Sequence, residues 1–370
     1  MLFIGKRFYT NRDALRERYG RIYQLPWHWA DVGLRTRLWL IDYHSREKAS
    51  VVDGALDVLS TPVFSGAAIG RAAVELFSRK RIDEMPRVVV ASGDCYIGLL
   101  AYRIARRLRA RLVFDVYDKY DEFEGYHRFF GFDSFDFLLR RADARLFASR
   151  ALMENLGANQ GSNHLVPNGL DSSRFRPLDR LASRRALGLA EDTSIVGYFG
   201  GMEPDRGVQD LIAAVSRLRA RGSPLELLLG GKPPADLDLN VPGVRFAGDV
   251  PYERMPAMLA SCDLLAIPYR RSAFMDAGAS NKIAEAIACQ RPIVATRTPN
   301  LTMNFPEQAE RLGELLAEPG DSEDLARAIQ AQLAERRMVH MPPGMDWSSI
   351  SATLAAELAL TPEAPFARRL

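Results

Sequence analysis

Two charged side chains three residues apart, Lys282 and Glu285, have the types and the spacing to bind a phosphorylated ligand. They lie in ASNKIAEAIACQRPIVAT, whose apolar pattern predicts a loop, a helix that begins near Ser280 and Asn281, and a buried strand. Lys282 falls in the first helical turn, where a positive charge opposes the helix dipole unless an anion is bound. Glu285 lies one turn further and could accept hydrogen bonds from the paired hydroxyls of a ribose. The alternative is a surface Lys–Glu pair, and in either case Ser280 is expected to cap the helix.

A second segment, SIVGYFGGMEPDRGVQDLI, repeats this chemistry. Its pattern predicts a strand, a loop with Gly200 and Gly201, and a helix that begins near Arg206. Glycines after a strand let the backbone approach a ligand closely, and the free N–H groups of a helix start favour a phosphate. Arg206 is again a cation at the unfavourable end of a helix. We therefore predict one diphosphate held by Arg206 and Lys282, with a tight turn and a solvated arginine as the alternative.

The elements that must position these residues form two similar series. Short apolar runs alternate with helical patterns along the whole chain, which is typical of parallel sheets covered by helices. With 370 residues, 47% of them hydrophobic, the chain is long enough for two cores. We predict an α/β protein with two Rossmann-like doubly wound domains, residues 1–170 and 171–340, facing a central cleft that holds the ligands. A C-terminal helix within residues 341–370 should pack back onto one domain.

The strands predicted for the two series start at eleven apolar runs, which are MLFIG, RLWLIDY, RVVVAS, RLVFDVY, ARLFAS and HLVPN in the first half and SIVGYFGG, LELLLGG, GVRFAGD, DLLAIPY and RPIVAT in the second. Between the series, the polar segment from Asn168 to Leu189 is broken by Pro177 and predicts a surface connection between domains.

The charge pattern bears on partners and location. A net charge of +3 is too small to require nucleic acid. The three cysteines are far apart and apolar in context, and MLFIGKRFYT has too short an apolar run for a signal peptide, so a cytoplasmic location is expected. Basic residues are concentrated in the N-terminal half, for example in SRKR and YRIARRLRAR. They suggest contact with an anionic membrane surface from its inner face, or with a lipid-linked acceptor.

Aromatic residues close to the first basic segment leave that interpretation open. They are Tyr19, Tyr23, Trp27 and Trp29, together with Leu25, in RYGRIYQLPWHWA. They could serve membrane contact or, as the simpler alternative, belong to the core of the first domain.

Four segments in the same order resemble the family-4 retaining glycosyltransferases of the GT-B fold. They are LVPNGLDSSRF, GYFGGMEPDRG, GVRFAGDVPYERMPAMLASCDLLAIPY and SNKIAEAIACQRPIVAT, within residues 140 to 300 or so. The resemblance implies a nucleotide-diphosphate sugar donor bound mainly by the C-terminal domain. It implies a hydroxyl acceptor, a glycan, lipid-linked or cell-envelope precursor, bound mainly by the N-terminal domain.

The resemblance also implies roles for individual donor-side residues. Arg206 stands where the family usually has a lysine on the diphosphate. Lys282 and the amides near Ser280 and Asn281 would contact the phosphates or the donor sugar, and Glu285 would contact the ribose. The Gly200–Gly201 loop would lie against the donor, and the base would lie near Val250, Pro251 and Tyr252.

Two positions depart from the family pattern. An arginine often follows the glycine that corresponds to Gly200, where this chain has Gly201. An acid is usual at the position of Ala277, one residue after Asp276. These departures affect the donor-sugar contacts expected here.

In the N-terminal half, RLVFDVYDKYDEF resembles the place where family members put a His–Asp or Arg–Asp pair. Tyr117 stands where a histidine is common. Asp118 and Asp115 are the candidates for a catalytic carboxylate near the acceptor hydroxyl, together with the donor-side cations Arg206 and Lys282. The first strand-to-helix loop should add four acceptor-side residues, Gly5, Lys6, Arg7 and Thr10.

The resemblance implies front-face transfer in which the leaving phosphate helps to deprotonate the acceptor. Developing negative charge would be stabilised by the two cations and the helix N-termini, without a metal or another cofactor. A nucleotide-sugar epimerase and a non-catalytic sugar-nucleotide or polysaccharide-binding protein are the alternatives. A pyridine-nucleotide oxidoreductase is disfavoured, because no G-x-G-x-x-G follows a strand. The sequence leaves the donor base, the sugar, the acceptor and the oligomeric state open.

Overall fold

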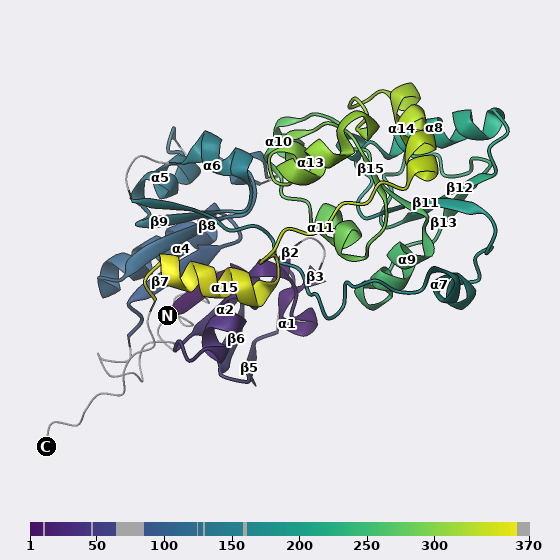
Figure 1. The fold of residues 1–370 in the computed structure, drawn as a ribbon. Helices are drawn as coiled ribbons and strands as arrows, with labels where there is room; N and C mark the ends of the chain where they lie inside the picture. The colour runs from purple at the N-terminus through teal and green to yellow at the C-terminus, as the bar shows by residue number, and fades with distance from the viewer. Residues whose placement is uncertain are drawn as a thin grey trace, which may run out of the picture. The chain divides into compact units, whose positions relative to one another are not determined.

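The computed structural model describes residues 1–9, 12–45, 47–63, 85–123, 125–128, 130–157 and 161–360. The chain divides into two compact units (Figure 1). Unit 1 comprises residues 1–169 and 344–370, and unit 2 comprises residues 170–343.

Unit 1 is built on an eight-stranded sheet whose strands are parallel except for β5 at one edge. In spatial order the strands are β10 (Ser162–Leu165), β9 (Ala144–Phe147), β8 (Arg111–Val116), β7 (Val88–Ser92), β1 (Leu2–Lys6), β4 (Arg37–Asp42), β6 (Leu56–Pro62) and β5 (Ala49–Asp53). A separate antiparallel pair joins β2 (Phe8–Tyr9) to β3 (Arg12–Asp13). The strand order changes direction between β1 and β7, and ligands of open α/β sheets bind at such a point.

The helices of unit 1 are α1 (Ala14–Glu17), α2 (Gly20–Asp31), α4 (Cys95–Leu108), α5 (Ser134–Arg141), α6 (Arg150–Leu156) and α15 (Trp347–Glu357), with the 3₁₀ turn η2 (Tyr120–Glu122). Parallel crossovers are right-handed, and the connections after β7, β8 and β9 all advance in one direction along the sheet. Helices α4, α5 and α6 therefore cover one face. The connection after β1 runs the other way, so α2 covers the opposite face, where α15 packs beside it (Figure 1).

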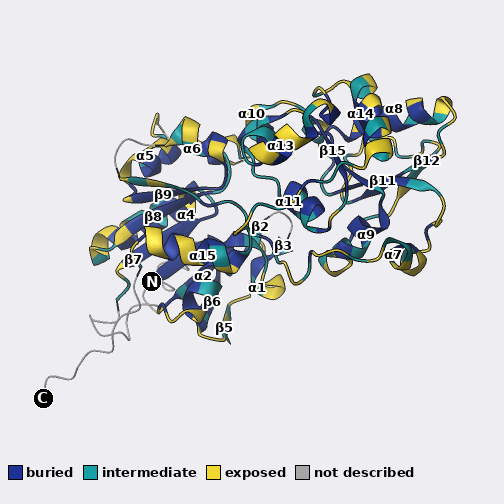
Figure 2. Ribbon diagram, viewed as in Figure 1, coloured by how far each residue is buried: buried dark blue, intermediate teal, exposed yellow. Residues whose placement is uncertain are grey.

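Unit 2 has a five-stranded parallel sheet in the Rossmann order, namely β13 (Val244–Phe246), β12 (Leu225–Gly230), β11 (Ser194–Phe199), β14 (Leu264–Ile267) and β15 (Ile293–Ala295). Its helices are α7 (Arg180–Leu187), α8 (Val208–Ala220), α9 (Met255–Ser261), α10 (Ala273–Ala277), α11 (Asn281–Ala288), α12 (Pro299–Thr302), α13 (Pro306–Leu312) and α14 (Ser322–Glu335), with the 3₁₀ turns η3 (Pro204–Arg206), η4 (Tyr252–Arg254) and η5 (Gly313–Leu315). The order changes direction between β11 and β14. Figure 2 shows the central strands buried and the outer helix surfaces exposed, and edge strand β13 is partly exposed.

All eleven predicted strands are present, and the mixed α/β fold class is confirmed. The predicted C-terminal helix is α15. The sequence did not reveal the hairpin of β5 and β6, because β5 is an edge strand with exposed Val51 and Val52 and lacks an apolar alternation. The aromatic segment of residues 19–29 forms α2, where Tyr23 and Trp29 are buried, so core packing rather than membrane contact explains these two rings.

Part of the segment expected to be a surface connection is instead embedded in unit 2. Arg184 of α7 is fully buried, donates to the carbonyl of Ser261, and forms an ion pair with Asp263 at 2.6 Å. The basic run SRKR lies outside the described residues. In the part of the chain that the structure describes, no helix combines the length and the apolar character needed to cross a membrane.

Candidate functional site

Lys282 lies directly against the glycine loop that follows β11. A methyl group placed on Gly200 would be 2.0 Å from Lys282 Cε and 2.6 Å from its Nζ, and Gly200 has a φ of +136° that favours glycine. The loop is held by a hydrogen bond of 2.7 Å from the Gly200 amide to the carbonyl of Gly230, and by Tyr198, which donates to the carbonyl of Gly201 at 2.5 Å. The structure thus brings together the two segments from which the diphosphate was predicted. Among the described residues, no carboxylate lies within ion-pair distance of Lys282.

Tyr269, which the sequence analysis missed, connects these segments to Arg206. Its hydroxyl shares a hydrogen bond of 2.8 Å with the hydroxyl of Ser280, and the guanidinium of Arg206 lies over its ring at 5.5 Å. Thr296 donates to the Tyr269 carbonyl at 2.6 Å, so the ring is fixed by its backbone as well. The expectation that Ser280 caps α11 is wrong. Ser280 occupies the N-cap position, but its hydroxyl is turned to Tyr269 and makes no cap hydrogen bond.

Arg206 belongs to the 3₁₀ turn η3, and α8 begins two residues later after Gly207, whose φ is +69°. Its guanidinium is 3.5 Å from the carboxylate of Glu203, whose side chain is 63% exposed. Burial alone would lower the pKa of Arg206, but Tyr269, Tyr198 and Glu203 outweigh burial and raise the pKa above its ordinary value. Arg206 therefore keeps its charge, and an exposed partner such as Glu203 can be exchanged for a bound anion.

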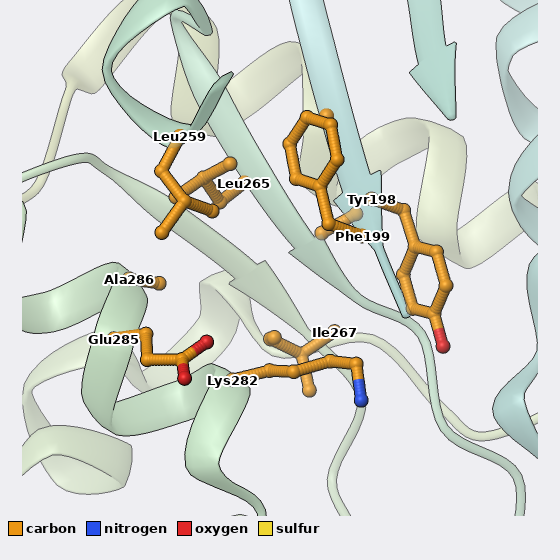
Figure 3. Close-up of a pocket in the computed structure, with 10 residues that line it drawn as sticks. Tyr198, Phe199, Leu259, Leu265, Ile267, Lys282, Glu285 and Ala286 are labelled. Carbon is orange, nitrogen blue, oxygen red and sulfur yellow. The ribbon is translucent and has the colours of Figure 1, made fainter. Parts of the chain in front are cut away.

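Glu285 shares a crevice with Lys282 at the point where the strand order of unit 2 reverses (Figure 3). The crevice is lined by Gly197, Tyr198 and Phe199 of β11, Leu259 of α9, Leu265, Ala266 and Ile267 of β14, and Lys282, Glu285 and Ala286 of α11. Figure 3 shows the Glu285 carboxylate beside the aliphatic part of Lys282, with the ammonium extending toward the end of β11. One wall therefore carries a carboxylate and a cation on neighbouring turns of one helix.

The residues predicted to lie near a base are divided between two environments. Val250, which is 8% exposed, and Pro251 line a cavity of about 190 Å³ with Leu228 of β12. Tyr252 is engaged elsewhere, because its ring contacts Phe175 at 5.5 Å and lies beneath the guanidinium of Arg174 at 4.7 Å. Val250 and Pro251 thus line a cavity, and Tyr252 is not among the residues that line it.

Two acceptor-side predictions in unit 1 are corrected by burial. Arg7 is 3% exposed and forms ion pairs with Asp13 at 2.9 Å and Asp42 at 3.0 Å. Asp115 is fully buried and accepts from Arg21 at 2.7 Å. These charges are satisfied inside the unit, so we assign Arg7 and Asp115 to its stability rather than to an acceptor.

The other predicted acceptor-side residues that the structure describes lie in the last part of β1 or just after β8. Gly5 is a strand residue, where a methyl group would be 2.4 Å from Ile22 Cγ2, so it serves close packing. Tyr117 donates to the carbonyl of Gly93 at 3.2 Å. Asp118 is half-buried and accepts from the amide of Lys119 at 2.9 Å. Thr10 lies outside the described residues.

Lys6 belongs to a small cluster that the sequence analysis did not assemble. Its ammonium lies over the ring of Tyr43 at 5.5 Å, and the Tyr43 hydroxyl is 3.5 Å from Asp94 Oδ1. A methyl group placed on Gly93, whose φ is +139°, would be only 2.8 Å from Lys6 Cβ. Burial raises the pKa of Asp94, against the amide of Ile97 and the charge of Lys6. The cluster lies where the strand order of unit 1 reverses, between β1 and β7.

Comparison with known proteins now places unit 2. Residues 193–335 match the family model described as glycosyl transferases group 1. The match covers most of unit 2 and no residue of unit 1. Over 214 residues the chain is 29% identical to the D-inositol 3-phosphate glycosyltransferase of Geodermatophilus obscurus, a match that covers 52% of this chain and 44% of the relative. The chain spans about half the length of the curated relatives it matches.

Solved structures confirm the GT-B fold of the chain. Sucrose-phosphate synthase from Thermosynechococcus elongatus superimposes with a TM-score of 0.69 and 17% identity, covering 97% of this chain and 98% of the other. HepE from Anabaena, solved with UDP and glucose, gives a TM-score of 0.65 and 17% identity, covering 97% and 99%.

The two positions at which the chain departs from the glycosyltransferase pattern, Gly201 and Ala277, have different surroundings. Gly201 has no left-handed φ, and a methyl group there would be 2.5 Å from the flexible Glu203 carboxylate. Ala277 is 6% exposed at the end of α10, and the preceding Asp276 pairs with Arg271 at 2.7 Å. Asp276 therefore does not replace the missing acid, because it is committed to an arginine.

Proposed function

We propose that this protein is a retaining glycosyltransferase that moves a sugar from a nucleotide-diphosphate sugar to a hydroxyl acceptor. One observation carries the proposal. Lys282 packs on the Gly200 backbone, and Tyr269 connects Ser280 beside it to Arg206. Two cations and the amides of a glycine loop are thus fixed in one region, as the binding of a diphosphate requires.

In the proposed reaction, the bond between the sugar and the diphosphate breaks and leaves negative charge on the leaving phosphate. Lys282 and Arg206 would stabilise that charge, because they are positioned before the reaction begins. Glu285 would accept hydrogen bonds from the ribose, and Val250 and Pro251 would border the base. This proposal uses no metal and no further cofactor.

The acceptor belongs to unit 1 in this proposal. Lys6, Tyr117 and Asp118 remain as candidates, and the correction of Arg7 and Asp115 leaves Asp118 as the proposed catalytic carboxylate. The acceptor would be a glycan, a lipid-linked or a cell-envelope precursor, and the enzyme would work in the cytoplasm at the inner face of a membrane. We expect Asp118→Ala to retain nucleotide binding.

Thermal-shift measurements with UDP, GDP, ADP and TDP test the donor site, because a ligand that binds only the folded state raises its melting temperature. We expect a shift for one of the four nucleotides, and its loss in Lys282→Ala and Arg206→Ala. Arg221→Ala is the matched control, since Arg221 is an exposed arginine on the same unit. Wild-type shifts in both site variants would refute the assignment.

A second candidate function follows from the missing cation and acid at Gly201 and Ala277. These residues favour a nucleotide-sugar-binding protein that does not catalyse transfer. Incubation with a nucleotide sugar of the base that gives a thermal shift, with water taking the place of the acceptor hydroxyl, followed by mass spectrometry of the products, separates the two functions. Release of the nucleoside diphosphate supports the transferase, and binding without release supports the second candidate.

A further inference from the structure

Exposed aromatic rings gather on the outer side of the α4–α5 layer of unit 1. Phe130 is completely exposed, and Phe132 and Tyr96 are each 44% exposed. A single exposed ring is ordinary, but three in one region are typical of a surface that another body covers. Phe130 also has a φ of +48°, an uncommon conformation for a bulky residue.

Direct contacts connect Phe132 to both helices and hold Tyr96 of α4 in place. Phe132 contacts Phe137 of α5 with ring centres 5.3 Å apart, and Phe137 contacts Tyr102 of α4 at 5.0 Å. The Tyr96 hydroxyl donates to the carbonyl of Gly125 at 3.0 Å. Phe132 therefore stands on an aromatic base that spans α4 and α5, and the Tyr96 ring is fixed by its hydrogen bond to Gly125.

Arginines extend from the same base into solvent. Arg106 donates to the Tyr102 hydroxyl at 3.2 Å and lies over its ring at 5.8 Å, and Arg141 lies over the ring of Phe137 at 5.8 Å. Both residues are exposed, and of the described carboxylates none is within ion-pair distance of either guanidinium. Arg128 and Arg140 are also exposed but are paired with acids. Arg106 and Arg141 thus provide uncompensated positive charge beside apolar rings.

We propose that this aromatic–arginine patch, Tyr96, Arg106, Phe130, Phe132 and Arg141, docks unit 1 on an anionic phospholipid surface. Lipid headgroups supply the negative charge that the arginines lack, and the interfacial region accepts aromatic rings that water does not favour. The patch belongs to the face covered by α4 and α5, opposite to the buried aromatics of α2, so the membrane side differs from the one first suggested by residues 19–29. The inference rests on the proposed function for its purpose, access to a membrane-held acceptor, but not for the binding itself.

Co-sedimentation of the full chain with vesicles tests this proposal. One set is pure phosphatidylcholine, and the other is an equal mixture of phosphatidylcholine and phosphatidylglycerol. We expect binding to the mixed vesicles only, with a decrease of about thirtyfold or more in Arg106→Glu/Arg141→Glu, since each basic residue near such a surface contributes about fivefold and the added acids are repelled by the lipid. Phe130→Ser/Phe132→Ser should bind more weakly at every salt concentration, because it removes a contribution that salt does not screen.

Arg185→Glu/Arg221→Glu is the matched control, with the same change in net charge on exposed arginines of unit 2, and it should bind like the wild type. The membrane assignment would be overturned if the wild-type protein did not bind the mixed vesicles, or if the patch variants bound them as strongly as the wild type. The patch would then be assigned to a protein partner. The nucleotide thermal shift is measured on the same protein preparations. If the wild type bound the vesicles but showed no nucleotide shift, the proposed transferase function would be refuted and the membrane assignment would stand.

Discussion

The arginines of unit 1 and the cations of unit 2 have the same chemistry in the sequence but opposite situations in the structure. Arg7 and Arg21 are buried and matched by Asp13, Asp42 and Asp115. Lys282 has no described carboxylate within ion-pair distance, and Arg206 has only the exposed Glu203 at 3.5 Å. A cation that is already neutralised stabilises the fold, whereas one that is left open can bind an anionic ligand.

The largest expected effect concerns the buried ion pair between Arg21 and Asp115 in unit 1. Arg21→Ala should cost about 3–5 kcal/mol in the free energy of unfolding, because it leaves the buried charge of Asp115 unpaired. All four tryptophans, Trp27, Trp29, Trp39 and Trp347, belong to unit 1, so tryptophan fluorescence during urea unfolding reports on that unit alone.

The control for this variant is Arg16→Ala, whose side chain is 72% exposed with partners at 3.7 Å. It should change stability by less than about 0.5 kcal/mol. Equal stability of the two variants would show that the pair of Arg21 and Asp115 does not stabilise unit 1.

A second expected effect is acid sensitivity of unit 1 through Asp42. Burial alone would raise the pKa of Asp42, but hydrogen bonds from Ser45 and His44 and the charge of Arg7 lower it overall. Its stabilisation is therefore complete above the ordinary aspartate pKa of about 3.9 and is lost as the pH falls through the lower folded-state value.

Urea unfolding of wild type and Asp42→Asn, followed by tryptophan fluorescence from about pH 5 to about pH 3, measures this dependence. The variant should be less stable at the higher pH and lose less on acidification, with exposed Asp31→Asn as the control. Parallel pH curves would contradict the role of Asp42.

A smaller effect is expected for Tyr269, which connects Ser280, two residues before Lys282 in the chain, to Arg206. Tyr269→Phe removes the hydroxyl that bonds Ser280 but leaves the ring under Arg206, and a neutral hydrogen bond contributes about 1 kcal/mol. We expect diphosphate affinity, measured by calorimetry, to fall by about fivefold. Tyr102→Phe in unit 1 is the control, and an unchanged affinity in Tyr269→Phe would mean that this connection does not organise the site.

The smallest expected effect comes from adding a cation to the glycine loop of unit 2. Gly201→Arg restores the residue common in the family, and the backbone and the exposed Glu203 side chain allow it. Diphosphate affinity should rise by about threefold, as for an exposed charge pair. Gly200→Ala is the contrasting variant and should weaken binding, because a methyl group would collide with Lys282. Equal effects of the two substitutions would contradict the loop geometry.

The strands could be predicted because apolar runs such as those of β7 and β11 are buried on both faces. Edge strand β5 was not predicted, because its exposed Val51 and Val52 follow no alternating pattern. The family motifs also located Lys282 and Gly200, which lie in direct contact.

The partners of the charged residues could not be predicted in the same way. Asp115 and Asp118 are three residues apart and look alike in sequence, but Asp115 is paired with Arg21, 94 residues away in the chain. Tyr269 was missed because its role depends on a hydroxyl and a guanidinium from two other segments. Contacts of this kind are set by tertiary packing, and no local pattern encodes them.

The most direct test of the central claim compares a nucleoside diphosphate with its own nucleoside by calorimetry, using the base that gives a thermal shift. If Lys282 binds phosphate, Lys282→Ala weakens the diphosphate by about tenfold or more and the nucleoside by less than about twofold. Equal losses for both ligands would show that Lys282 supports the shape of the site rather than binding phosphate, and would contradict the account.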